Sequence, residues 1–197
     1  MRVFGIDPGS GRTGYGCVDS DGARHQLVTC GAIAAPAGAS FPEKLHGIHR
    51  TLTQLIATHH PDCVVIENLF HARNARSALL LGHARGVAVL AAVEAGLPVV
   101  EYTPAEIKVA IVGYGRAEKR QMQQMVKLLL RLDAVPTPHD AADALAIAIC
   151  HLHASTSLAA RAARVAGRGT APAKAGGRPL RSWRDYRPGQ PLRRSLP

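Results

Sequence analysis

The sequence lacks the signals that would place it at a membrane or in an oxidising compartment. No N-terminal stretch combines a charged start with an apolar core, as a signal peptide does, and we expect no apolar run long enough to span a bilayer. Its four cysteines have no spacing of a zinc site or redox pair, which favours buried free thiols: Cys17, Cys30, Cys63 and Cys150. We therefore expect a cytoplasmic protein that does not bind membranes.

Acidic residues are scarce in the last part of the chain. The 197 residues contain 24 Lys and Arg but 14 Asp and Glu, a formal net charge of +10. Residues 158–197 hold ten of the basic residues and one acid, Asp185, so residues 1–157 keep 24 − 10 = 14 basic and 14 − 1 = 13 acidic residues. The sequence predicts one domain over residues 1–157 and a basic tail over 158–197.

Branched aliphatic residues are almost absent from that tail, which is rich in Ala, Gly, Pro and Arg. Such a segment buries too little apolar surface to offset the entropy of ordering it, so we interpret residues 158–197 as disordered. A basic disordered arm is typical of electrostatic anchoring to nucleic acid, with Trp183 and Tyr186 able to stack on bases or a partner protein. A tail without a partner fits the same composition.

The order of the elements predicts a mixed α/β fold. Three strands in a meander are followed by two strands that are each approached through a helix, which indicates a five-stranded sheet flanked by helices on both faces. No internal repeat is present. The predicted strands are 2–7, 14–19, 26–33, 62–67 and 98–102, and the predicted helices are 40–59, 74–95, one starting at 104, 118–132 and 139–154.

Four acidic residues lie in apolar surroundings. Asp7 and Glu67 each end an apolar run, and Asp140 and Asp143 lie three apart, on one face of an Ala-rich helix. Two carboxylates about 4 Å apart repel by roughly 4 kcal/mol at an effective dielectric near 20, so a shared site calls for a divalent cation. A plain Gly-rich hairpin at Asp7 and a helix cap at Asp140 are the alternatives.

Several ordered motifs resemble the RuvC-type Holliday-junction resolvases. They are Asp7-Pro8-Gly9-Ser10 with Thr13-Gly14-Tyr15-Gly16, then Ile66-Glu67 with Phe70 and Arg73-Asn74, Ala84-Arg85-Gly86-Val87, and Asp140-Ala141-Ala142-Asp143. The similarity covers about residues 1–155. It implies a ribonuclease H-like fold, a homodimer, and magnesium- or manganese-dependent nicking of two strands at a four-way DNA junction, alongside the junction-processing proteins RuvA and RuvB.

The resemblance also implies roles for the four acids. Asp7, Glu67, Asp140 and Asp143 match the family's catalytic residues, which hold two Mg²⁺ ions that activate a water and stabilise the leaving 3′ oxygen. Asp7 is the expected bridging ligand. Some relatives carry His in place of the third acid, but His139 points about 100° away from Asp140 along a helix, so the geometry disfavours a catalytic role for His139 and leaves the question open.

DNA contacts are expected from basic residues near the acids and from one aromatic residue. Lys108 and Lys119 match lysines that the family uses near its active site, and Phe70 resembles an aromatic stacked on a base at the junction. A solvated surface charge or a core aromatic would explain the same residues. The other candidates are Arg73, Arg76, Arg116 and Arg120.

Two other classes of protein remain open at this point. An actin-like ATPase or sugar kinase also begins with a strand, an Asp and a Gly-rich hairpin, but it needs a second phosphate-binding loop that we do not find. A protein that binds branched DNA without cutting it would have no need of all four acids.

Overall fold

The computed structural model describes residues 1–9, 11–68 and 74–166, and residues 1–158 form one compact unit. Five strands form one sheet in the order β3-β2-β1-β4-β5. β1 pairs antiparallel with β2 and parallel with β4, which confirms the predicted mixed sheet. The strands are β1 Arg2–Asp7, β2 Arg12–Ser20, β3 His25–Ala34, β4 Cys63–Glu67 and β5 Val99–Tyr102.

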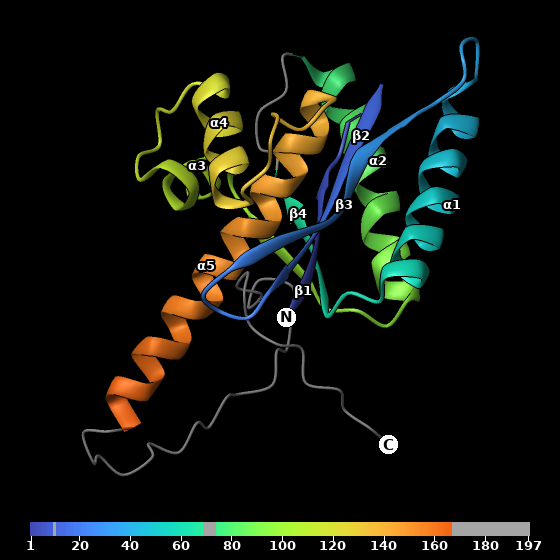
Figure 1. Ribbon diagram of the computed structural model, residues 1–197. Helices are drawn as coiled ribbons and strands as arrows, with labels where there is room; N and C mark the ends of the chain where they lie inside the picture. Colours follow the sequence, from blue (N-terminus) through green and yellow to red (C-terminus); the bar gives the residue numbers. More distant parts are fainter. Residues whose placement is uncertain (10, 69–73, 167–197) are drawn as a thin grey trace, which may run out of the picture. The chain divides into compact units, whose positions relative to one another are not determined.

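Helices cover both faces of the sheet, as predicted (Figure 1). Because side chains alternate along a strand, β1 sends Phe4 and Ile6 to one face and Val3 to the other. α1 Phe41–His59 and α2 Ala75–Glu94 pack on the Phe4 face. α3 Pro104–Val112, α4 Lys119–Leu129 and α5 His139–Ala166 follow, and all three contribute to the cluster that contains Val3.

Local signals explain where several helices begin. Ser40 with Glu43, and Thr103 with Glu106, form capping boxes that satisfy the first backbone N–H groups of α1 and α3. A left-handed Gly113 ends α3. These starts and this break agree with the sequence.

Glycines let α5 lie directly against the sheet. A Cβ atom at Gly14 would lie 2.0 Å from the Asp140 backbone oxygen, and one at Gly5 would lie 2.1 Å from the Ala144 oxygen. Only a residue without a side chain permits this approach. The Gly-rich hairpin therefore brings the first turns of α5 onto β1 and β2.

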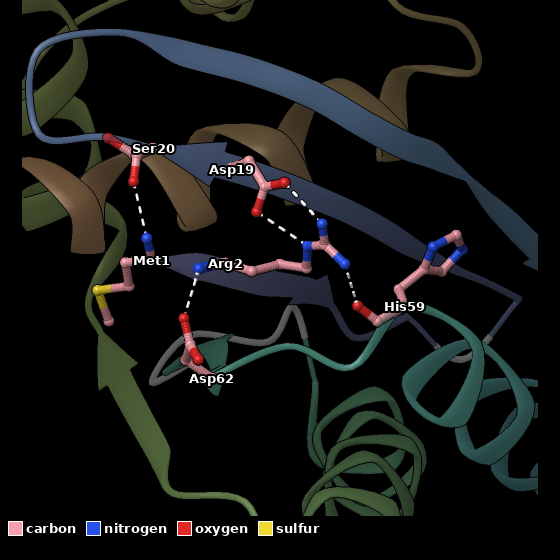
Figure 2. A network of polar contacts seen from close by, with 6 residues as sticks. All are labelled: Met1, Arg2, Asp19, Ser20, His59 and Asp62. Carbon is pink, nitrogen blue, oxygen red and sulfur yellow. Dashed lines mark hydrogen bonds and ion pairs between the residues drawn. The ribbon is translucent and has the colours of Figure 1, made fainter.

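The start of β1 is held by a polar network around Arg2 (Figure 2). The Arg2 guanidinium donates to both carboxylate oxygens of Asp19, at 2.8 and 2.7 Å, and to the His59 carbonyl at 2.6 Å. Its backbone N–H donates to Asp62 at 2.6 Å. These contacts tie β2, the end of α1 and the start of β4 to β1, which fixes the strand whose other end carries Asp7.

Two expectations need correction. The last helix continues to Ala166 instead of ending near residue 154, so the first part of the segment predicted to be disordered is helical. α2 is also long and apolar enough to cross a membrane by length and composition, contrary to the expectation of no such run. Its alanines Ala84, Ala88, Ala91 and Ala92 are fully buried in the core, although only 22% of the apolar window is buried. The division at residue 157 stays a prediction.

All four cysteines are free, as expected from their spacing. Cys17, Cys63 and Cys150 are buried, and Cys30 is half-buried.

Candidate active site

Asp7 and Glu67 lie side by side at the ends of two parallel strands. β1 and β4 pair with Ile6 opposite Ile66, so the next residue of each strand is an acid. The pleat places both on the face covered by α5, because Val3 and Val65 of the same strands contribute to the cluster on that face. A side-chain hydrogen bond joins the two carboxyl groups.

α5 brings the other two acids to this end of the sheet. Asp7 pairs with Gly14 in the sheet, and the backbone of Asp140 rests on Gly14. Asp140 Oδ2 lies 3.6 Å from Arg12 Nη1, and Asp143 follows one turn later. The close contact that glycine allows is therefore what places α5 beside Asp7.

A cavity of about 250 Å³ lies between these elements. Three of the acids and two lysines line it, together with apolar side chains of α3, α4 and α5. Its polar lining consists of Asp7, Glu67, Lys108, Lys119 and Asp143. Asp140 is outside this lining, but its charge acts on Asp7.

Burial and neighbouring charges strongly raise the pKa of the Asp7 carboxyl group. Desolvation first, and then Glu67, Asp143 and Asp140, raise the pKa of Asp7 to about 8, against a smaller opposing effect of Lys119. At neutral pH the metal-free site therefore keeps a proton on Asp7. That proton explains how two adjacent carboxyl groups can share a hydrogen bond.

The pKa of Glu67 is raised as well. Burial is the main cause, and the Asp143 charge adds to it. Lys108, Lys119 and the hydrogen bond from Asp7 act in the opposite direction. The site thus has more carboxyl groups than its lysines can neutralise.

The chemistry of this donor set fits a divalent cation. A hard cation favours carboxylate oxygens, and its charge would offset the burial and the repulsion that raise the pKa of Asp7. Among the residues that the structure describes, no three His, Cys, Asp or Glu side chains already form a cluster that could hold a metal ion. Asp143 is instead paired with the Lys119 ammonium, at 2.7 Å between Nζ and Oδ2.

The predicted basic residues divide into two groups. Lys108 and Lys119 line the cavity, whereas Arg116 and Arg120 are exposed beside α4 and Arg76 is exposed in the first turn of α2. Phe70 and Arg73 lie outside the described residues.

Two polar residues near the acids, Arg12 and Gln123, were missed by the sequence. Arg12 pairs with Asp140 from within the Gly-rich segment. Gln123 Nε2 lies 2.8 Å from His139 Nδ1, so His139 contacts α4. The only available signal for Gln123 was its position four residues after Lys119, on the same face of α4.

The comparison with known proteins decides the family. Residues 3–151 match the family model of the crossover junction endodeoxyribonuclease RuvC. The chain belongs to the RuvC family. The resemblance seen in the motifs is thereby confirmed, and RuvC nucleases depend on a metal.

Named RuvC proteins are similar along most of their length. The chain is 54% identical over 152 residues to the RuvC endodeoxyribonuclease of Alkalilimnicola ehrlichii, covering 77% of this chain and 91% of that protein. The chain is also 54% identical over 159 residues to the RuvC endodeoxyribonuclease of Koribacter versatilis, covering 80% of this chain and 96% of that protein.

A solved structure agrees in fold and sequence. Thermus thermophilus RuvC in complex with a Holliday junction substrate has a TM-score of 0.76 at 34% identity, over 80% of this chain and 96% of that chain. The sheet and helices thus match a RuvC structure, which confirms the ribonuclease H-like fold.

Proposed function

We propose that this protein resolves Holliday junctions in homologous recombination and DNA repair. It binds a four-way DNA junction and makes two symmetric nicks, each by phosphodiester hydrolysis that leaves a 3′-OH and a 5′-phosphate. The observation that carries the proposal is the cavity that brings Asp7, Glu67 and Asp143 together with two lysines, where burial first and then the neighbouring acids raise the pKa of Asp7. Membership of the RuvC family supports it.

The site is proposed to take two Mg²⁺ ions, with Mn²⁺ as a substitute. Asp7 would bridge the pair, and Glu67, Asp140 and Asp143 would complete the ligand set. When bound, such a pair supplies a more acidic water and charge stabilisation of the attacking and leaving oxygens.

The chain's own residues prepare this chemistry. Asp7 must release its proton to act as a ligand, and because its pKa is raised, that release costs free energy at neutral pH, which binding of a cation would have to offset. Lys108 and Lys119 provide positive charge inside the cavity, which favours a phosphate beside the acids. The apolar residues Ile107, Met122 and Ile147 limit the water around the acids, which strengthens each electrostatic contact.

DNA binding is proposed to extend outward from the cavity. The exposed Arg76, Arg116 and Arg120 are placed to contact phosphates, which give most of the sequence-independent affinity. Arg73 as a phosphate contact and Phe70 as a stacking residue stay predictions.

A homodimer would supply the two sites that paired nicks require. α2 presents a broad apolar surface: Leu79, Leu90 and Val93 are exposed large hydrophobic side chains. Gly82 and Gly86 lie four residues apart on this helix, and a Cβ atom at either would meet nothing within 4 Å. A second copy of α2 can therefore approach closely around a two-fold axis.

Cytoplasmic localisation and cooperation with RuvA and RuvB are proposed from family membership. A junction resolvase acts on chromosomal DNA, and in bacteria that DNA lies in the cytoplasm.

A nicking assay on a labelled four-way junction tests the proposal. In Mg²⁺ the wild type should give paired symmetric nicks, and Asp7→Asn should reduce nicking by roughly 10²-fold or more while junction binding stays intact. Asp133→Asn, the same change at an exposed loop acid, is the matched control. Nicking by D7N at the wild-type rate would refute the metal assignment. ATP hydrolysis without nicks would favour the ATPase, and binding without either activity would favour the non-cutting binder.

A further inference from the structure

Two side-chain contacts join α4 to α5 beside the cavity. Lys119 Nζ lies 2.7 Å from Asp143 Oδ2, and Gln123 Nε2 lies 2.8 Å from His139 Nδ1. Lys119 and Gln123 are four residues apart on α4, and so are His139 and Asp143 on α5, so each pair shares one helix face. The later residue of α4 meets the earlier residue of α5, as in antiparallel helices.

The two contacts differ in how easily they can be exchanged. Gln123 is only 8% exposed, so losing its partner would leave a buried polar group unsatisfied. The Lys119 side chain is 60% exposed and that of Asp143 is 29% exposed. An ion pair this open to water contributes little to stability. The inner contact can therefore hold the helices together while the outer one opens and closes.

We propose that Lys119 is an exchangeable counter-ion of the active site. Its ammonium neutralises Asp143 while neither metal nor DNA is bound, and it transfers to a phosphate of the junction when both bind. The inference rests on the proposed function, because the phosphate is that of the substrate. Lys119 suits the role because a flexible four-carbon stem carries a compact charge with three donors.

Exchange of Lys119 between Asp143 and a phosphate couples metal binding to DNA binding. The ammonium and a metal ion compete for the Asp143 carboxylate, so metal binding to the free protein must displace Lys119. A phosphate that attracts Lys119 frees the carboxylate, and the junction then strengthens metal binding. By linkage, the metal strengthens junction binding by the same factor.

Lys108 provides a matched control. It lines the same cavity, but its charge acts on Glu67 and its side chain comes from α3. Lys119→Met and Lys108→Met remove the same charge from the same cavity. Only the first removes the ion pair with Asp143.

Calorimetric titration with Ca²⁺, a hard cation used here as the probe, measures the coupling. Without DNA, K119M should bind Ca²⁺ roughly 5-fold more tightly than wild type, and K108M should show a smaller gain. The factor by which an intact four-way junction raises Ca²⁺ affinity should shrink by a similar amount in K119M and stay near the wild-type value in K108M. Equal effects of the two substitutions on both quantities would overturn the proposal.

A second measurement follows Lys119 itself. Reductive ¹³C-methylation keeps the charge of lysine and gives each side chain an NMR signal, and loss of one signal in K119M assigns Lys119. That signal should move when Ca²⁺ and junction are added to the wild type. A signal that stays unchanged at saturation would show that the ion pair is static, and would overturn the exchange.

These outcomes separate the inference from the proposed function. If wild type nicks the junction in Mg²⁺ but K119M retains the full coupling, the exchange is refuted and the resolvase assignment stands. If wild type binds Ca²⁺ and the junction but never nicks it, the proposed function fails.

Discussion

Asp7 gives the metal-free protein a distinctive dependence on pH. Its pKa is raised from 3.8 to about 8 by burial and by the neighbouring carboxyl groups. Between these values the folded protein keeps a proton that the unfolded chain has lost. The unfolded state binds fewer protons there, so the free energy of unfolding falls as pH rises from about 4 to about 8 and levels off above that.

Asp7→Asn should remove this contribution. In EDTA, the stability of D7N relative to wild type should increase by roughly 2 to 4 kcal/mol between pH 4 and pH 8. Urea unfolding at a series of pH values measures the difference, with D133N as the control that should follow wild type. Mg²⁺ should raise the stability of wild type more than that of D7N. A difference between D7N and wild type that does not vary with pH would contradict the assignment.

The sequence identified the acids but not their partners. Asp7 and Glu67 could be found because acids are rare at the ends of buried strands. The pairing of Arg12 with Asp140, and of Lys119 with Asp143, joins residues from separate elements and depends on how α4 and α5 pack. Local spacing carries no information on such contacts.

At the scale of elements, Gly14 controls the position of α5. A Cβ atom there would lie 2.0 Å from the backbone of Asp140, so Gly14→Ala must push the start of α5 away from the sheet. We expect a loss of roughly 1 to 3 kcal/mol in stability, as for other overpacked sites, and weaker metal binding because Asp140 and Asp143 move with the helix.

Gly47→Ala is the matched control for Gly14→Ala. Gly47 lies inside α1, and a Cβ atom there meets nothing within 4 Å. Alanine at a helix interior should stabilise by roughly 0.5 to 1 kcal/mol. Thermal unfolding of both variants tests whether the two substitutions change stability in opposite directions. Titration of each variant with Ca²⁺ measures the effect on metal affinity. A G14A protein with wild-type stability and Ca²⁺ affinity would show that α5 is placed by other contacts.

Strands and helix starts were predictable because their signals are local. The short apolar run of β1 and the capping boxes of α1 and α3 are formed by residues that are close in the sequence. The end of α5 was predicted too early, since its Ala- and Arg-rich continuation to Ala166 was interpreted by composition as disordered, although both residues favour helix. The exposed apolar face of α2 could not be predicted from the sequence. It depends on which side of the helix packs against the sheet, and only the folded structure shows that.

At the scale of the whole molecule, the exposed apolar side chains of α2 predict a dimer interface on this helix. Leu90 is 48% exposed on this helix, and Leu128 is 66% exposed on α4. Leu90→Glu should weaken a dimer formed through α2 by roughly 10-fold or more, because a charge would be buried in the interface. Leu128→Glu should leave the dimer intact. Sedimentation across a concentration series measures both.

The assembly state should also appear in the products. A plasmid with an extruded four-way junction becomes linear when both nicks are made together, and a nicked circle when one is made alone. Wild type and L128E should give linear product, and L90E should give nicked circles. Linear product from a monomeric L90E would show that the two nicks do not require α2 pairing.

The separation of charge along the chain predicts a divided role in DNA binding. Residues 1–157 are nearly neutral, so local basic residues around the cavity must hold the junction over the acids. Of the ten basic residues in 158–197, Arg161 and Arg164 lie in α5, which leaves 10 − 2 = 8 after Ala166.

A chain ending at Ala166 keeps the cavity and removes those eight basic residues. If the segment contacts DNA, the slope of log affinity against log salt should flatten by roughly 2 to 5, since each phosphate contact contributes about 0.9. The nicking rate at saturating junction should remain that of the full chain, because the residues that line the cavity are unchanged. A salt slope equal to that of the full chain would show that the positive charge of the tail does not serve junction binding.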